Sequence, residues 1–346
     1  MAEENIPNLI EKDIFPDVKN AVMENNDTLI LDFGNHYVGY FSFYLDFVRE
    51  YIDAPVRLNI KFCETKEELE DNFSSYKGSL CKSWLQEEVV NIDFLGRYEM
   101  PIRYAVRYIK ITAVASPKPF KLSNFILKSA TSGDMKNLKK YDILDNELKK
   151  IDITAVNTLK NCMQRVFEDG PKRDRRLWIG DFRLEALTDY CTFDERSVVR
   201  RCLYLFAAAD TNDCGFLPGF VYENPMYVSG DWFLMDYALL YVVSACDYYM
   251  HTKDSDVFYD IYPIIKKQMD AAFLSIDEDG IISAKSGSDI FIDWCEGLEK
   301  ITALHGVYLY TLDRLINVLN ELKHEDIYPS VTIILVFNMY FNDFIL

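Results

Sequence analysis

The chain has 346 residues, with 37 Lys and Arg against 55 Asp and Glu, so its formal net charge is −18. This length favours two domains over one, and an apolar fraction of 49% excludes an intrinsically disordered chain. A negative field repels phosphate backbones and anionic lipid head groups, so we expect neither nucleic acid nor a membrane surface as a partner.

The cysteine and histidine spacings predict no metal site and no cofactor. None of the eight cysteines forms a CxxC pair, and the four histidines lie far apart in the sequence. We expect these histidines to be structural: His36, His251, His305 and His324. The N-terminus is acidic and no apolar signal segment follows it, which together with free thiols predicts a cytoplasmic protein.

Residues 1–132 read as a domain of short strands. Apolar and polar residues alternate strictly over 56–62 and in part over 103–111, which is typical of strands with one buried face. Gly34 and Asn35 interrupt another apolar run. A charged insertion at 66–71 predicts a surface loop or one helical turn. Without intervening amphipathic helices, this pattern predicts an antiparallel β-sandwich. The expected strands are 28–33, 37–45, 56–62, 103–111 and 121–127.

Helical patterning follows a polar linker at 133–145. Asp145 is positioned to cap a first helix over 147–167, Asp194 is a possible cap for a later one, and Asp254 or Ser255 begins another. We count about six helices between 146 and 329, whereas a closed (α/α)6 barrel needs twelve. The expectation is therefore about half of such a barrel. The remaining helices are 182–191, 193–210, 232–251, 257–276 and 300–322.

The last segment, 330–346, is apolar but lacks a helical stripe. It is interrupted by polar residues and is a poor candidate for a membrane span. Such a bare apolar end is unusual for a cytosolic domain. We interpret the chain as truncated, with this atypical tail standing outside the ancestral fold.

A loop from Glu168 to Asp181 combines carboxylates, several cationic side chains and Trp178. Gly170, Pro171 and Gly180 oppose a continuous helix, so this segment is expected to connect two helices. Carboxylates and guanidinium groups can bond sugar hydroxyls, and an indole face can pack on ring C–H groups. A solvated surface loop is the alternative.

The segment Asp169–Asp181 resembles the bacterial α-L-rhamnosidases of glycoside hydrolase family 78, which carry D-x-P-x-R-[DE]-R-x-x-W-x-G-D at this place. The motifs Gly230-Asp231-Trp232 and Asp293-Trp294 are similar to two later motifs that line the family's barrel mouth. The resemblance implies a β-sandwich followed by an (α/α)6 catalytic barrel. It also implies inverting hydrolysis of terminal α-L-rhamnosyl residues, with a rhamnose-containing oligosaccharide or glycoside as the ligand.

By position, Asp174 stands where the family's general acid lies, although many members have Glu there. Asp169 and Asp181 match carboxylates that bond the rhamnose hydroxyls. The family's general base is a Glu in the second half of the barrel, beyond the end of this chain, and Glu296 is a conceivable substitute. The other residues assigned to substrate binding are Arg173, Trp178, Asp231, Trp232, Asp293 and Trp294.

Other readings remain open at this stage. Asp174 could form a surface ion pair with Arg173 or Arg176, Asp231 could cap a helix beginning at Trp232, and each Trp could be a core residue. The protein could bind carbohydrate without turnover, be an inactive fragment, or cleave another deoxy sugar or a glucuronide on the same barrel. A homo-oligomer is possible.

Overall fold

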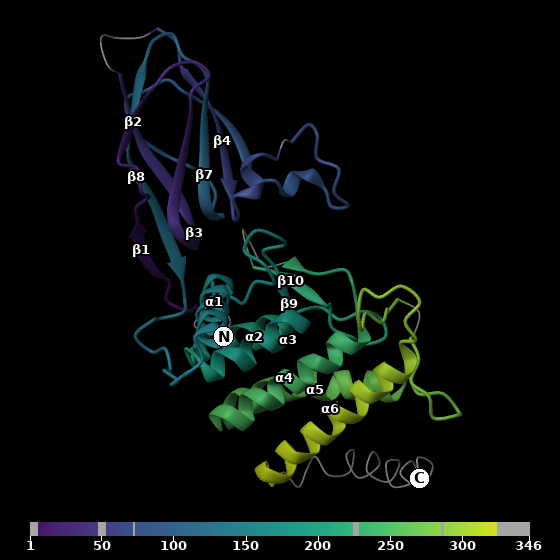
Figure 1. Cartoon of the computed structure of the whole chain (residues 1–346). Coiled ribbons are helices and arrows are strands. Elements are labelled where there is room, and N and C mark those ends of the chain that lie inside the picture. The colour runs from purple at the N-terminus through teal and green to yellow at the C-terminus, as the bar shows by residue number, and fades with distance from the viewer. Residues whose placement is uncertain (1–5, 48–52, 72, 224–227, 285–286, 324–346) are drawn as a thin grey trace. The chain divides into compact units, whose positions relative to one another are not determined.

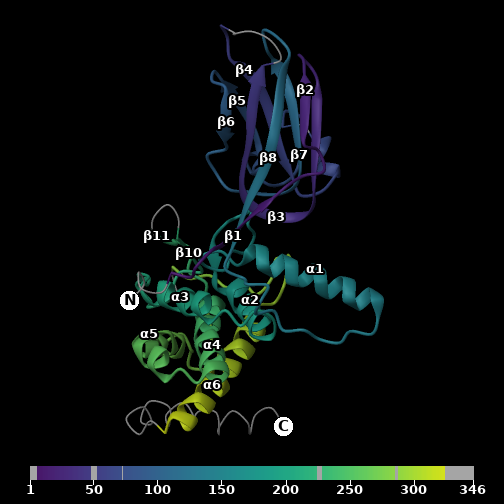
Figure 2. The same cartoon turned by 90° about the vertical axis from the view of Figure 1, so that its left-hand side faces the viewer.

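The computed structural model describes residues 6–47, 53–71, 73–223, 228–284 and 287–323 (Figures 1 and 2). It divides into two compact units, residues 7–175 and the residues from 176 onward. The atypical tail at 330–346 and His324 lie outside the described residues. No helix within the described ranges has the length and apolar character needed to span a membrane.

The first unit is built on an antiparallel sheet with the strand order β1-β8-β3-β7-β4-β5, in which β2 also pairs with β8 and β6 with β3. The sheet curves around one apolar core (Figure 2). The predicted sandwich class is confirmed. Its strands are β1 (Ile10–Ile14), β2 (Asn20–Met23), β3 (Thr28–Phe47), β4 (Val56–Cys63), β5 (Glu87–Ile92), β6 (Gly96–Glu99), β7 (Tyr104–Ala115) and β8 (Phe120–Thr131).

Strand β3 is the hub of the sheet. The prediction of two strands separated at Gly34 and Asn35 was wrong, because β3 runs through both residues. Gly34 takes a φ of +78°, and the register with β7 shifts between Asp32 and Tyr37, so the irregularity is absorbed as a bulge. The first half of β3 pairs with β7 and the second half with β8, while β6 pairs with residues 42–45.

The strict alternation seen in the sequence marks the buried face of the sheet. Leu58, Ile60 and Phe62 of β4 are buried, and the intervening side chains are not. The Phe41 ring lies at the centre of the core, with centroid distances of 6.0 Å to Phe62 and 6.5 Å to Phe125. Burying one such side chain fully contributes about 1.5–3 kcal/mol, so this aromatic group anchors the sheet.

The first helix, α1 (Asn146–Cys162), follows β8 in the same unit (Figure 2). The predicted cap is confirmed, because the Asp145 carboxylate accepts hydrogen bonds from the amides of Glu147 and Leu148 at 2.8 Å each. The helix ends at Cys162 rather than at Phe167, because the chain turns there and buries Val166 and Phe167 in a loop instead.

The charged insertion contains one helical turn, η1 (Glu67–Leu69), as the sequence allowed, and a second turn, η2 (Lys82–Trp84), follows it. Leu69 of η1 is buried, so this insertion packs onto the sheet instead of lying free in solvent.

The second unit contains three short strands and the other helices (Figure 1). Helix α4 is central and packs against α2, α5 and α6. Asp254 caps α5 through the amide of Val257, as expected. The elements are β9 (Leu177–Trp178), α2 (Ile179–Cys191), α3 (Arg196–Ala207), β10 (Phe220–Tyr222), β11 (Val228–Ser229), α4 (Met235–Thr252), α5 (Ser255–Phe273) and α6 (Ile301–Leu322).

Two residues of this unit that the sequence offered as possible caps do not cap a helix. Glu195 rather than Asp194 caps α3, with its carboxylate accepting from the amide of Ser197 at 3.3 Å. Asp194 instead has a φ of +53° and binds Arg196 and His251. Helix α4 begins at Met235 with Leu234 as its N-cap, so Asp231 does not cap it.

A buried ion triad joins three helices of the second unit. Asp247 of α4 has a side chain only 7% exposed. Its carboxylate lies 3.3 Å from Nε of Arg183 on α2 and 2.6 Å from Nη2 of Arg314 on α6. Two guanidinium groups from different helices therefore share one carboxylate, which fixes α2 and α6 against α4.

Candidate active site

The segment Glu168–Arg175, here the acid loop, turns back on itself. Both carboxylate oxygens of Asp169 accept from the amide of Asp174, at 3.0 and 3.1 Å. The amide of Arg175 donates to the carbonyl oxygen of Gly170 at 3.0 Å. A side chain at Gly170 could not be accommodated, because a Cβ there would lie 2.2 Å from the Arg173 oxygen. These bonds fix the backbone that carries Asp174.

The Asp174 side chain is 14% exposed and forms an ion pair with Arg173, whose Nε lies 3.2 Å from its Oδ1. The ion pair that the sequence allowed is therefore present, with Arg173 as the partner. The Arg173 guanidinium is 45% exposed, so the pair is accessible to solvent on one side. Such a half-exposed pair contributes little to stability.

The first residue of the acid loop is bound to the sheet. Nη2 of Arg103 donates to both carboxylate oxygens of Glu168, at 2.7 Å each. Nη1 of Arg103 also donates to Gln164 at 2.8 Å, and Gln164 in turn donates to the carbonyl of Ala130. Burial raises the pKa of Glu168, against the opposing charge of Arg103.

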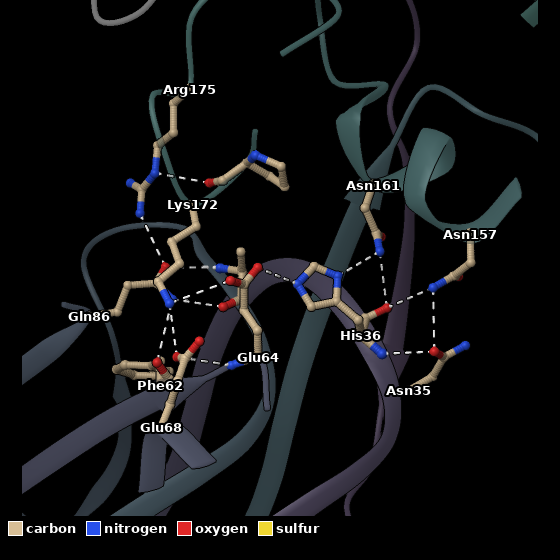
Figure 3. Close-up of polar contacts among 12 residues, drawn as sticks. Asn35, His36, Phe62, Glu64, Glu68, Gln86, Asn157, Asn161, Lys172 and Arg175 are labelled. Atoms are coloured by element: carbon tan, nitrogen blue, oxygen red, sulfur yellow. Dashed lines mark hydrogen bonds and ion pairs between the residues drawn. The ribbon is translucent and has the colours of Figure 1, made fainter. Parts of the chain in front are cut away.

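Lys172 extends from the acid loop to two carboxylates near the insertion that follows β4, as Figure 3 shows. Its Nζ lies 2.8 Å from Glu68 and 3.4 Å from Glu64. Glu64 also accepts from Nε2 of His36 at 2.9 Å, and Nδ1 of His36 lies 2.8 Å from Nδ2 of Asn161 on α1. The acid loop, the insertion and α1 thus share one polar network.

The charges of Glu64 and Lys172 shift each other's pKa. Burial raises the pKa of Glu64, but the hydrogen bond from His36 and the charge of Lys172 outweigh it, so the pKa lies below its ordinary 4.5. Burial lowers the pKa of Lys172, but Glu68 and Glu64 outweigh it and leave the pKa raised above 10.5. Both groups are therefore held in their charged forms.

Replacing Glu64 by Gln is expected to destabilise the chain by about 1 kcal/mol at neutral pH. Because the folded carboxyl has a depressed pKa, its contribution is complete above pH 4.5 and is lost as the pH falls through the folded value. Urea unfolding of both proteins from pH 7 downward should show the difference narrowing below pH 4.5. The exposed Glu278→Gln should show no such trend, and a pH-independent difference would contradict the assignment.

Arg175 attaches the other end of the acid loop. Its Nε donates to the carbonyl of Pro171 at 3.0 Å, and its Nη2 donates to Oε1 of Gln86 at 3.3 Å (Figure 3). Gln86 is 8% exposed, and its amide group also bonds the backbone of Ala105 through both N–H and C=O. Arg175 has a φ of +63°, so the chain bends here as it leaves the loop.

In the second unit, aromatic side chains follow one another in a row. The Trp178 ring lies 6.0 Å from Trp232 and 6.3 Å from Tyr237, both edge to face. Tyr237 lies 5.7 Å from Phe291, which lies 5.0 Å from Trp294. We call these five rings the aromatic row. Trp178, Trp232 and Trp294, which the sequence assigned to substrate binding, are therefore linked through two rings that it did not single out.

Local pairing places Trp178 in the aromatic row. Strand β9 pairs with β10, which sets Trp178 opposite Phe220. Two residues later, Gly180 allows Tyr237 to approach, since a Cβ at Gly180 would lie 2.7 Å from the tyrosine ring. Arg176 stacks over the rings of Phe220 and Tyr222, at 5.2 and 4.7 Å.

The segment that carries Asp293 and Trp294 is fixed to the start of α4. Asp236, which is 3% exposed, accepts from the amides of Phe291 at 3.1 Å and Ile292 at 2.9 Å. The Asp293 carboxylate accepts from the amide of Trp294 at 2.6 Å. Trp294 itself is 80% exposed, so the core alternative does not apply to this indole.

Trp232 donates from Nε1 to the carboxylate of Asp289 at 2.8 Å. Asp231, immediately before it, is exposed, and Asp181 is half-buried in the first turn of α2. Asp169, Arg173 and Asp174 belong to the first unit, whereas the other assigned residues belong to the second. Their convergence on one sugar stays a prediction.

Sequence reasoning missed the side chains that hold these groups. Gln86, Glu64 and Glu68 looked like ordinary strand or surface residues, and only contacts distant in sequence reveal their role. Asp236 lies inside an apolar helix pattern, and a carboxylate at a buried helical position was a usable signal.

Two family models match the chain. Residues 9–129 match the N-terminal domain of glycosyl hydrolase family 78 α-rhamnosidases. Residues 144–317 match the six-hairpin glycosidase domain of bacterial α-L-rhamnosidases, which is half of the chain. The chain belongs to the family 78 α-L-rhamnosidases. The resemblance drawn from the central motif is confirmed, and with it the assignment to the glycosidases.

Solved structures agree with this family. A rhamnosidase from Klebsiella oxytoca with rhamnose bound is 34% identical with a TM-score of 0.85, and the match covers 92% of this chain and 67% of that one. A family 78 rhamnosidase of Bacillus sp. GL1 is 20% identical with a TM-score of 0.69, covering 87% of this chain and 30% of the other, and supports the fold. No match was found among curated protein sequences.

Proposed function

We propose that this α-L-rhamnosidase-family chain binds terminal α-L-rhamnosyl groups and hydrolyses them with inversion, with Asp174 as the general acid. The observation that carries the proposal is the geometry of the acid loop. Asp169 holds the amide of Asp174 through both carboxylate oxygens. The structural match to a protein with rhamnose bound supports the choice of sugar.

Hydrolysis requires a proton for the leaving glycosidic oxygen. In the proposed reaction Asp174 gives this proton as the bond to the anomeric carbon breaks, and a water activated by a second carboxylate attacks the opposite face. The second carboxylate in an inverting enzyme stands about 6.5–9.5 Å from the acid, which leaves room for that water. We assign this general base to no residue of the chain.

The remaining residues are proposed to hold the sugar. Asp169 and Asp181 accept hydrogen bonds from rhamnose hydroxyls. A carboxylate has about four lone-pair sites, so Asp169 can accept from the Asp174 amide and from a hydroxyl together. The indole faces of Trp178 and Trp232 cover the apolar side of the deoxy sugar. Arg173, Asp231, Asp293 and Trp294 supply further polar and apolar contacts.

Two measurements separate the proposed enzyme from a carbohydrate-binding protein without turnover. Calorimetric titration with L-rhamnose reports binding, and release of a nitrophenol from an aryl α-L-rhamnoside reports cleavage. Heat without nitrophenol release favours the binding protein. Folded protein that gives neither signal contradicts both, and cleavage of another deoxy sugar or of a glucuronide in place of the rhamnoside would redirect the proposal.

Replacing Trp294 by Ala is expected to weaken binding of an aryl rhamnoside by about fivefold, because a stacking contact of roughly 1 kcal/mol is lost. The indole is 80% exposed, so stability should change by no more than about 0.5 kcal/mol. Titration calorimetry and thermal unfolding measure the two effects. Trp84→Ala in η2, where the indole is half-buried, is the control for the binding measurement. Unchanged affinity would remove Trp294 from the substrate contacts.

A further inference from the structure

Besides Arg173, two cationic side chains lie close to Asp174 in sequence, and both are anchored in the sheet unit. Lys172 precedes Asp174 by two residues and reaches Glu68 and Glu64. Arg175 follows it directly and reaches Gln86. Figure 3 shows Lys172 and Arg175 extending from the same loop to these neighbours. The residue proposed as the acid is thus bracketed by two attachments to the same sheet.

These attachments are too enclosed to be incidental surface pairs. The Lys172 side chain is 19% exposed and that of Glu68 is 24% exposed. Glu68 also accepts a hydrogen bond from the amide of Glu64 at 3.3 Å, so its carboxylate is held in place independently of Lys172. A charge-assisted bond in such a setting has a defined geometry, whereas an exposed lysine samples many rotamers.

A general acid needs this kind of support. Proton transfer depends on the acid lying within hydrogen-bond reach of the leaving oxygen, and loops are less exact supports than helices or strands. Misplacing a reacting group by about 1 Å can cost about 100-fold in rate. The hydrogen bonds within the acid loop determine its conformation. The bonds to the sheet determine the position of the loop.

We propose that Lys172, held by Glu68 and Glu64, is a positioning residue for Asp174, so that the sheet unit serves as the mount of the acid loop. This inference rests on the proposed role of Asp174. In this proposal the sheet unit contributes to turnover by holding the general acid in place, and it has no separate sugar-binding role. The Gln86–Arg175 attachment holds the other side of the same loop.

The test compares Lys172→Met, which keeps the stem but removes the charge, with Lys172→Arg, which keeps the charge. With an aryl rhamnoside, Lys172→Met should lower kcat by about 10–100-fold and change the Kd for L-rhamnose by less than about threefold. Lys172→Arg should retain most of kcat. Reversing the pair with Lys172→Glu and Glu68→Lys together should recover part of the loss.

Amide hydrogen exchange gives a readout that does not need turnover. The amides of Asp174 and Arg175 are bonded inside the acid loop, and in Lys172→Met they should exchange about tenfold faster or more. Lys128→Met is the control, because it removes an exposed pair with Glu11 elsewhere in the same sheet. It should leave both the loop amides and kcat unchanged.

The outcomes separate the two proposals. If the amides of the acid loop exchange at an unchanged rate in Lys172→Met, the sheet unit is not the mount of this loop. Faster amide exchange with an unchanged kcat in an active protein contradicts the proposal as well. Should the unsubstituted chain cleave no rhamnoside, the proposed function fails, and the exchange result alone decides whether Lys172 holds the loop.

Discussion

In a form of the protein that turns over rhamnosides, replacing Asp174 by Asn is expected to lower turnover of an aryl α-L-rhamnoside by about 10²–10⁴-fold, because Asn cannot donate the proton that the leaving oxygen requires. The substitution preserves size, and the Asp169 carboxylate bonds the backbone amide of residue 174, which Asn retains. The acid loop should therefore keep its shape. Calorimetry should find L-rhamnose bound nearly as tightly as before, while steady-state kinetics show the loss in kcat.

The dependence on the leaving group sharpens this test. A nitrophenolate needs less help from an acid than an alkoxide does, because it is the more stable anion. Asp174→Asn should consequently impair cleavage of an alkyl rhamnoside more than cleavage of a nitrophenyl rhamnoside. Asp279→Asn, on an exposed turn, is the control with the same chemical change. Equal losses on both substrates, or none, would falsify the assignment of Asp174 as the general acid.

Replacing Asp247 by Asn should destabilise the helical unit by about 2–4 kcal/mol, since it leaves two guanidinium groups without their shared carboxylate. Arg183 is 17% exposed and Arg314 is 30% exposed, so neither can be fully rehydrated without movement of α2 or α6. The corresponding drop in Tm is about 5–15 °C, measurable by calorimetric unfolding.

Asp270→Asn is the matched control for this prediction, because Asp270 forms an exposed pair with Lys266 within α5. That pair contributes at most a few tenths of a kcal/mol, and the control should unfold close to the unsubstituted chain. If Asp247→Asn and Asp270→Asn are equally stable, water solvates the two guanidinium groups as well as the Asp247 carboxylate does, and the prediction is wrong.

Features encoded within a few residues could be predicted. Asp145 and Asp254 cap their helices because a carboxylate at that position meets free amides of the first turn, whatever lies elsewhere. Strand β4 was recognisable because its alternation marks one buried face, whereas β7 carries consecutive buried residues at Tyr104, Ala105 and Val106. The acid loop stood out through Gly170, Pro171 and its charges, and the family motif within it assigned the chain correctly.

Features that depend on distant partners could not be predicted. Strand β3 continues past Gly34 because β7 and β8 pair with it, and local sequence indicates a stop there. Asp194 has the right side chain to cap α3, yet His251 and Arg196 engage it instead. The attachment of Lys172 to Glu68 joins residues 104 positions apart, and no spacing rule anticipates it.

The central place of β3 also has a consequence for vectorial synthesis on the ribosome. All three strands that pair with β3 lie later in the chain, and the last of them, β8, ends at Thr131. One edge of an emerging β3 therefore stays unpaired until β8 is complete at Thr131, 84 residues beyond Phe47, and pairing between strands so distant in sequence is associated with slow folding. Nascent chains should need chaperone protection over that interval, and substitutions that weaken β8 should reduce the yield of soluble protein more than its final activity per molecule.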